Sequence, residues 1–215
     1  MRVGILGSGL MGGKLGTLFA RAGHTVVFSY ARRLQKLKRL ARDAGGRAGF
    51  GTPAEAVSGA DAVLLAVHWS RVGDVLEQAG GLAGQAVLTC MLPMDATDSR
   101  LVIANTSSGA EALARRLRRA RVVSAFGTVP SEVFFDVYAR RRSRRRPTLL
   151  YCGDDARAKK VAARLIRDVG FEPLDAGPLR LARYLEPMTL LVARLAYEIG
   201  RGPRMSYRFE WIGRG

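Results

Sequence analysis

The sequence contains little of what metal sites, disulfide frameworks and membrane spans require. Of its 215 residues only two are cysteines and two are histidines, and the histidines stand in no ligand-like cluster. No apolar run approaches the roughly 20 residues that cross a bilayer. We therefore expect no resident metal and no membrane span. We also expect Cys90 and Cys152 to be buried free thiols rather than a disulfide pair.

Acidic residues are also scarce. The chain has 18 Asp and Glu against 35 Lys and Arg, which gives a formal net charge of +17. Such a charge attracts anions of any kind, including nucleotides and acidic cofactors, and does not by itself indicate a nucleic-acid function. The first six residues pass directly into a glycine-rich loop, so we expect no export signal and a cytoplasmic protein.

Short apolar, β-branched segments alternate with helical patterns along most of the chain. This alternation is typical of a parallel sheet wound with helices, so the predicted fold is α/β, a Rossmann-type doubly wound, mainly parallel sheet. We expect strands at residues 2–6, 25–29, 61–67, 86–90, 121–125 and 148–152, with shorter ones near Arg47 and at 171–174. The helices are expected at residues 10–22, 34–44, 70–78, 109–118 and 155–169.

The pattern changes after Gly177. We therefore divide the chain into an NADP-binding Rossmann domain at residues 1–177 and a small helical extension at 178–215. Residues 178–200 predict a long helix with an apolar stripe, typical of core or of a homodimer interface. Pro187 should kink or split this helix. Residues 206–211 are expected to form a last short strand.

The motif Gly7-Ser8-Gly9-Leu10-Met11-Gly12 carries the chemistry that the sequence reveals most directly. It follows the first strand and opens the first helix, which is where dinucleotide-binding domains place their phosphate loop. The first glycine permits a tight turn, the second lets the backbone approach a pyrophosphate, and the third lets helix and strand pack closely. The helix N-terminus adds amide donors.

The end of the second strand indicates which dinucleotide binds. Proteins that prefer NAD commonly place an acid there for the ribose hydroxyls. This chain has Ser29-Tyr30-Ala31-Arg32-Arg33 instead, with Lys36 one turn later. A hydroxyl and several cations suit a 2′-phosphate, which favours NADP(H). The alternative is that residues 32–39 are only the solvated face of a basic helix.

Several further segments resemble the family of F420-dependent NADP oxidoreductases over nearly the whole chain. The shared segments are Val67-His68-Trp69, Leu92-Pro93, residues 124–130, Cys152-Gly153-Asp154-Asp155, Asp175-Ala176-Gly177-Pro178-Leu179 and Arg183-Tyr184-Leu185-Glu186-Pro187. The resemblance implies that Val67, His68 and Trp69 border the adenosine and ribose, and that Pro93 and Ser131 border the nicotinamide. It further implies that Met91, Leu92, Thr128 and Pro130 contact the second substrate.

The resemblance implies an NADP(H)-dependent oxidoreductase that transfers a hydride between NADPH and an F420-type deazaflavin or a similar acceptor. Such transfer depends on holding two rings together and excluding water, so no catalytic residue is assigned. Two alternatives stay open. The protein could be an NADPH reductase of another acceptor, such as a flavin or a ferric chelate, or an NADP(H)-binding sensor without turnover.

The run from Arg140 to Arg146 has three interpretations. It could be a solvated loop, a docking site for the anionic tail of an acceptor, or a nucleic-acid contact. The run lacks the interleaved aromatic residues that stack on bases, so we expect no nucleic-acid partner. The expected partners are a small-molecule hydride acceptor and a second copy of the chain, with no membrane.

Overall fold

The computed structural model describes residues 1–213, and residues 214–215 of the expected extension lie outside this part. Strands and helices alternate, as the apolar pattern predicts. The strands are β1 (Arg2–Leu6), β2 (Thr25–Ser29), β3 (Ala48–Phe50), β4 (Ala62–Leu65), β5 (Ala86–Thr89), β6 (Arg121–Ala125), β7 (Thr148–Gly153) and β8 (Glu172–Asp175). The α-helices are α1 (Leu10–Arg21), α2 (Leu34–Ala44), α3 (Pro53–Val57), α4 (Val72–Ala79), α5 (Gly109–Arg116), α6 (Phe134–Ala139), α7 (Ala156–Asp168) and α8 (Ala182–Tyr197). Short 3₁₀ turns precede three of them: η1 (Trp69–Arg71), η2 (Ser131–Val133) and η3 (Leu179–Leu181).

All eight strands form one sheet in the order β3-β2-β1-β4-β5-β6-β7-β8. Every neighbouring pair is parallel except β6 and β7, which run antiparallel. The predicted doubly wound, mainly parallel α/β fold is therefore confirmed. The strand order turns back between β1 and β4, and this is the switch point where open α/β sheets bind their ligands.

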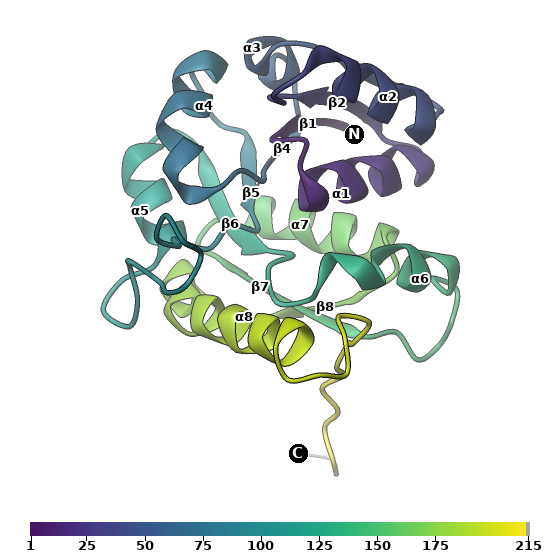
Figure 1. The fold of residues 1–215 in the computed structure, drawn as a ribbon, viewed down its shortest axis with the longest axis vertical. Coiled ribbons are helices and arrows are strands. Elements are labelled where there is room, and N and C mark those ends of the chain that lie inside the picture. The colour runs from purple at the N-terminus through teal and green to yellow at the C-terminus, as the bar shows by residue number, and fades with distance from the viewer. Residues whose placement is uncertain (214–215) are drawn as a thin grey trace.

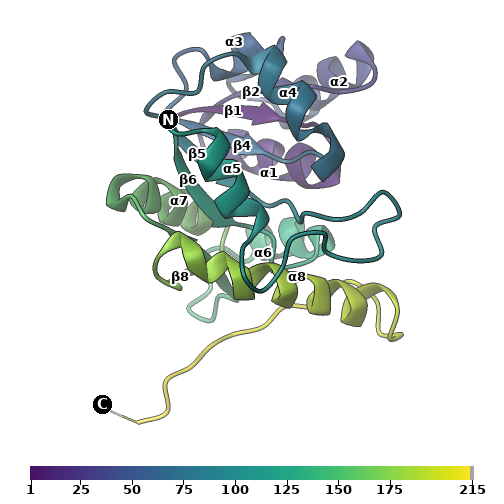
Figure 2. The ribbon, with the colours of Figure 1, turned by 90° about the vertical axis from the view of Figure 1, so that its left-hand side faces the viewer.

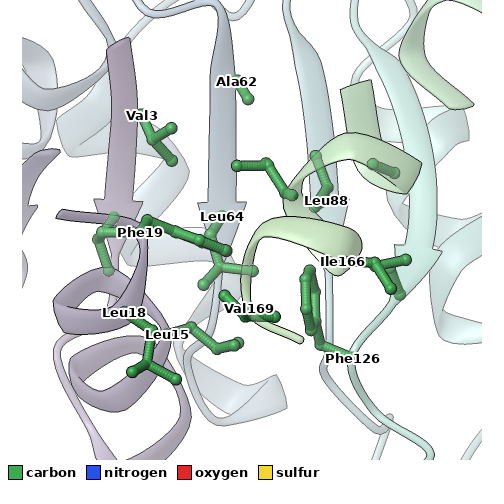
Figure 3. Packing of buried hydrophobic residues seen from close by; sticks show 14 of the residues in the cluster. Val3, Leu15, Leu18, Phe19, Ala62, Leu64, Leu88, Phe126, Ile166 and Val169 are labelled. Atoms are coloured by element: carbon green, nitrogen blue, oxygen red, sulfur yellow. The ribbon is translucent and has the colours of Figure 1, made fainter. Parts of the chain in front are cut away.

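Helices cover both faces of the sheet (Figure 1). On one face α1, α2, α6 and α7 enclose the larger apolar cluster, and on the other α3, α4, α5 and the start of α8 enclose the second. Figure 3 shows how Phe19 of α1, Phe126 after β6 and Ile166 of α7 meet over the central strands. Phe19 and Phe126 pack edge to face, with ring centroids 5.8 Å apart. Close packing of these side chains against the central strands therefore keeps the region of the switch point rigid.

Two expectations about the C-terminal part are wrong. The helix is not split at Pro187, because α8 continues from Ala182 to Tyr197 (Figure 2). Residues 206–211 form no strand. Two hydrogen bonds join this segment to Thr148. The Thr148 N–H donates to the Tyr207 carbonyl (2.9 Å), and the Phe209 N–H donates to the Thr148 Oγ1 (3.0 Å). β6 pairs with β7 only at residues 151–153, so the segment reaches the start of β7 at Thr148 but makes too few backbone hydrogen bonds there to form a strand.

Candidate functional site

A cleft of about 1210 Å³ opens at the carboxyl ends of β1, β2 and β4. It lies at the topological switch point, as the motif predicts. Nine of the residues expected to bind the cofactor line it. They are Gly7, Ser8, Gly9, Tyr30, Arg32, Arg33, Lys36, Val67 and His68.

The three glycines of the loop have different surroundings. Gly7 has a φ of +106°, and a Cβ there would lie 2.4 Å from the Ala66 carbonyl oxygen. At Gly12 a Cβ would lie 1.9 Å from the carbonyl oxygen of Gly7, so helix and loop approach too closely for any side chain. A Cβ at Gly9 would meet nothing within 4 Å. The second glycine thus faces open space, which is the room that a pyrophosphate needs.

The backbone donors beside Gly9 also suit an anion. The amides of Gly7 and Ser8 are already used, because they donate to the carbonyls of Ser29 and Tyr30. Helix α1 begins after Gly9 without a side-chain cap, and its first turn contains no acid. The first amides of a helix have no partner within it, so here they and the positive end of the helix dipole face the cleft.

The far end of the cleft is cationic. Arg32, Arg33 and Lys36 from the start of α2 line it, together with Arg71 from η1. Asp98 is the one carboxylate among the described lining residues, and it lies near His68 instead. Exposed guanidinium groups around an open pocket match the geometry of a phosphate monoester. The cleft therefore fits a dinucleotide with a 2′-phosphate.

Ser29 does not face the cleft, contrary to the expectation. It is fully buried, and its hydroxyl donates to the Ile5 carbonyl of the neighbouring strand (2.7 Å). Its own carbonyl accepts from the Gly7 amide and from the Ser8 hydroxyl (2.9 Å). Both faces of β2 are covered, so a short polar side chain at its end turns inward to satisfy the loop. Ser29 shapes the phosphate loop rather than contacting the phosphate.

Tyr30, the residue after Ser29, lines the cleft at the end of β2. Its φ of +57° turns the chain sharply at the end of β2, and its hydroxyl donates to the Asp74 carboxylate on α4. Gln78 also donates to Asp74 (3.1 Å). These two hydrogen bonds lower the pKa of Asp74. A fixed aromatic ring therefore borders the cleft on the side of β2.

His68 connects the cleft to the long loop after β5. The Ser70 amide donates to Nδ1 (3.2 Å), which leaves Nε2–H to donate to Asp98 (3.0 Å). Ala96 and Asp98 bring this loop into the cleft wall, and Figure 2 shows the loop, which joins β5 to α5, projecting from the body above α8. Trp69 packs against the second apolar cluster and is not among the residues that line the cleft.

The residues expected around the nicotinamide and the second substrate are not among those that line the cleft. Met91 and Leu92 are half-buried, and Pro93 packs against the backbone of Gly109. Thr128, Pro130 and Ser131 are buried in the turn that leads from β6 to η2. Leu10 and Met11 stand in the first turn of α1, and Leu10 is 70% exposed.

Sequence reasoning missed several residues of the cleft. Arg71, Gln78, Ala96 and Asp98 line it, and Asp74 holds Tyr30. Arg71 could have been found, since it follows the expected ribose segment by two residues. Asp98 belongs to an aperiodic loop, and no local pattern indicates that it returns to His68, 30 residues earlier.

The C-terminal segments on which the resemblance rests stabilise the fold and do not line the cleft. Glu186 of α8 is buried and accepts from the Gly109 and Ala110 amides (2.8 and 2.9 Å), which caps α5. Arg183 forms a two-pronged pair with Glu111 of α5 (2.9 and 2.7 Å). Asp154 accepts from the Leu179 amide (2.8 Å). These contacts fasten α8 to α5 and to the end of β7.

Glu186 should give the stability of the protein a distinctive pH dependence. Burial raises the pKa of its carboxyl to about 7, although the two amide bonds oppose the rise. Between the ordinary pKa and 7 the folded state then binds more protons than the unfolded state, so stability falls as pH rises through this window. Relative to Glu186→Gln, the wild type should lose about 2 kcal/mol of unfolding free energy between pH 5 and pH 8. Urea unfolding of both proteins measures this, and a difference constant with pH would contradict it.

Cys90 and Cys152 are not among the residues that line the cleft. Both cysteines are free, and burial raises the pKa of each thiol to about 12, so neither is a thiolate at neutral pH. Within residues 1–213 no three His, Cys, Asp or Glu side chains gather as metal ligands. Over the same residues, no helix has both the length and the apolarity to span a bilayer.

Among solved structures the chain is similar to a candidate F420-dependent NADP reductase from Arthrobacter sp. FB24. The TM-score is 0.84 with 22% identity, over 98% of this chain and all of that one. It is also similar to a reductive aminase from Aspergillus terreus solved with NADPH and ethyl-5-oxohexanoate, with a TM-score of 0.65 and 18% identity over 90% of this chain and 61% of that one. At these identities the likeness establishes the fold.

In sequence the chain is 30% identical to metalloreductase STEAP3 of Rattus norvegicus over 189 residues, which is 88% of this chain. It spans 36% of the length of that relative. Residues 2–93, which contain the glycine loop, the basic end of the cleft and His68, match the family described as NADP oxidoreductase, coenzyme F420-dependent. The N-terminal part of the chain, which carries the cleft, therefore resembles this family.

Proposed function

We propose that the protein is an NADP(H)-dependent oxidoreductase that transfers a hydride between NADPH and an F420-type deazaflavin or a similar two-electron acceptor. The observation that carries this proposal is the cleft itself. It joins an uncapped helix N-terminus and an open glycine position to a group of cations. A pyrophosphate suits the first part and a 2′-phosphate the second.

In this proposal each part of the site holds one part of the cofactor. The loop from Gly7 to Gly12 carries the pyrophosphate, Arg32, Arg33 and Lys36 carry the 2′-phosphate, and Tyr30, Val67 and His68 border the adenosine and its ribose. When bound, the cofactor supplies the hydride. The protein contributes positioning and the exclusion of water, which are the main requirements of hydride transfer.

A second acceptor class is favoured by one specific observation. The relative with 30% identity is a metalloreductase, and the match covers most of this chain. Reduction of a ferric chelate, directly or through a flavin, is therefore the competing activity. A sensor that binds NADP(H) without turnover is the third possibility.

One experiment separates these functions. The protein is mixed with NADPH and, in parallel, with F420, FMN or ferric EDTA, and the loss of nicotinamide absorbance is followed. We expect oxidation with F420 or FMN that saturates with acceptor concentration. Tight NADPH binding without oxidation by any acceptor would support the sensor, and turnover with ferric EDTA alone would support the metalloreductase.

We further propose that residues 1–177 form the NADP-binding unit, and that residues 178–215 pack on it and join two copies of the chain. Leu185 and Val192 of α8 are buried, whereas Leu191, Leu195 and Ile199 are 58%, 39% and 66% exposed. Leu191 and Leu195 are four positions apart and share one face of α8, and Ile199 follows just after the helix ends at Tyr197, so the three form an exposed apolar group.

This apolar group predicts a homodimer. Light scattering at micromolar concentration should give twice the 23.3 kDa mass of the chain. The double variant Leu191→Lys with Leu195→Lys should then be monomeric, because four like charges would face one another across the interface. A monomeric mass for the unmodified protein would contradict this proposal.

A further inference from the structure

Four polar side chains outside the cleft form a chain of contacts that the cofactor site does not use. The Lys14 ammonium donates to the Ser131 hydroxyl (2.9 Å), which donates to the Glu132 carboxylate (3.3 Å). The Tyr197 hydroxyl donates to the same carboxylate oxygen (2.7 Å). These contacts join α1, η2 and the end of α8, three elements that are far apart in the sequence.

The position of this cluster relates it to the phosphate loop. Lys14 lies one turn inside α1, the helix that opens with that loop. Its side chain reaches the turn after β6, whereas the cationic end of the cleft lies toward β2. A dinucleotide whose 2′-phosphate is bound at Arg32 and Arg33 must point its nicotinamide half away from β2, and thus toward Lys14.

The electrostatics of Lys14 indicate an unfilled role. The side chain is half-buried, and its ammonium has a hydroxyl as its hydrogen-bond partner. Within the described residues no carboxylate lies in ion-pair distance of it, and the Glu132 carboxylate is separated from it by the Ser131 hydroxyl. An ammonium has three donors, so two remain for a ligand. A half-buried cation with two unused donors favours a ligand that is electron-rich or becomes so.

The Glu132 carboxylate has a supporting part in this arrangement. Burial acts to raise the pKa of Glu132, but the hydrogen bonds from Tyr197 and Ser131 and the charge of Lys14 together lower it, so the carboxylate stays ionised at neutral pH. The hydrogen bond to Glu132, with burial, raises the pKa of Tyr197 to about 12. The phenol therefore keeps its proton and continues to hold the carboxylate. Glu132 is thus fixed where it orients the Ser131 hydroxyl toward Lys14.

We propose that Lys14 binds and orients the hydride acceptor, and that Ser131, Glu132 and Tyr197 position its ammonium. This inference rests on the proposed function. The acceptor it fits is a conjugated carbonyl or imine, such as the ring system of a deazaflavin or flavin. The hydride carries two electrons to an electrophilic ring atom of the acceptor, a carbon in a deazaflavin and a nitrogen in a flavin, as the C4–H bond of the dihydronicotinamide breaks. The displaced π pair then moves to the acceptor oxygen or nitrogen, which takes one proton from water. Lys14 stabilises the charge at that atom.

The test is a comparison of Lys14→Met, Lys14→Arg and the matched control Lys160→Met, an exposed lysine on α7. Acceptor binding is measured without turnover, by the fluorescence of FMN and of F420 with protein saturated by NADP⁺. We expect Lys14→Met to weaken binding of the acceptor about 30-fold and to lower kcat/KM for it about 100-fold. The dissociation constant of NADP⁺ should stay within about threefold, and Lys14→Arg should restore most of the loss.

Each outcome decides the proposal. Equal acceptor binding by Lys14→Met and wild type would overturn it. A parallel loss of NADP⁺ binding would overturn it too, because Lys14 would then be a cofactor ligand. If the wild type bound neither acceptor, the site would not take this class of ligand. If the wild type bound an acceptor through Lys14 but never oxidised NADPH, the proposed function would fail and this site would stand. Should Lys14→Met unfold, Ser131→Ala takes its place, with a smaller loss of acceptor affinity expected.

Discussion

Replacing Arg32 and Arg33 together with glutamine should weaken NADPH binding about a thousandfold while NADH binding changes by less than about fivefold. Both guanidinium groups line the basic end of the cleft and are exposed. A charge-assisted hydrogen bond to a phosphate contributes about 2 kcal/mol, so losing two of them costs about 4 kcal/mol, or three orders of magnitude. NADH carries no 2′-phosphate, so its binding loses only the general electrostatic attraction of the two positive charges. Isothermal titration with each nucleotide measures both constants.

The control for this variant lies on the same helix. Arg39 and Arg42 are exposed residues of α2 that do not line the cleft, so Arg39→Gln with Arg42→Gln removes the same charge from the same element. This control should leave NADPH binding within about threefold at 0.15 M salt, where separated surface charges are screened. Similar losses in both double variants would mean that net charge, and not a phosphate pocket, attracts NADPH.

The substitution Gly9→Asp should abolish tight binding of both nucleotides and leave the fold intact or slightly more stable. A Cβ at this position meets nothing within 4 Å, and the backbone is already extended (φ −76°, ψ −154°) as an N-cap requires. The aspartate would cap α1 and complement its dipole, which stabilises by about 0.5–1 kcal/mol. The same carboxylate would stand where the pyrophosphate must lie. Near a protein surface such repulsion amounts to about 4 kcal/mol at 4 Å.

Nucleotide affinity and thermal stability should therefore change in different directions. NADPH and NADH affinity should both fall at least about 100-fold, whereas the melting temperature should stay equal or rise by a few degrees. Gly12→Ala provides the contrast, because its Cβ would lie 1.9 Å from the Gly7 carbonyl oxygen. That variant should lose stability as well as binding. If Gly9→Asp bound NADPH as the wild type does, the open space at Gly9 would not be the pyrophosphate site.

Much of the fold could be predicted from local patterns. The boundaries of β1, β2, β6 and α2 agree with the expected ranges, since each combines a clear apolar pattern with strong end signals. The strands expected at 61–67 and 86–90 are shorter in the structure, because the chain leaves the sheet early to build the loops of the site. A strand was wrongly expected at 206–211, because a local pattern cannot reveal that this segment contacts β7 at Thr148 alone.

The site residues show the same difference between local motifs, which the sequence reveals, and contacts made only by tertiary folding. Gly7, Gly9, Arg32 and Arg33 belong to short motifs whose geometry follows from the chain itself, and all four line the cleft. Ser29 was assigned by proximity in sequence, and the structure turns it into the interior, where it bonds to Ile5. The contacts between Lys14 and Ser131 span 117 residues, and those between His68 and Asp98 span 30. Such contacts depend on tertiary folding and leave no periodic signal in the sequence.

The most direct measurement is a calorimetric titration of the unmodified protein with NADPH and with NADH under identical buffer and salt. A cleft that holds both the pyrophosphate and the 2′-phosphate should bind one NADPH per chain, at least about 100-fold more tightly than NADH, because the two nucleotides differ only in the group that Arg32 and Arg33 face. Equal affinity for the two nucleotides, or no saturable binding of NADPH, would contradict the assignment of this cleft as an NADP(H) site.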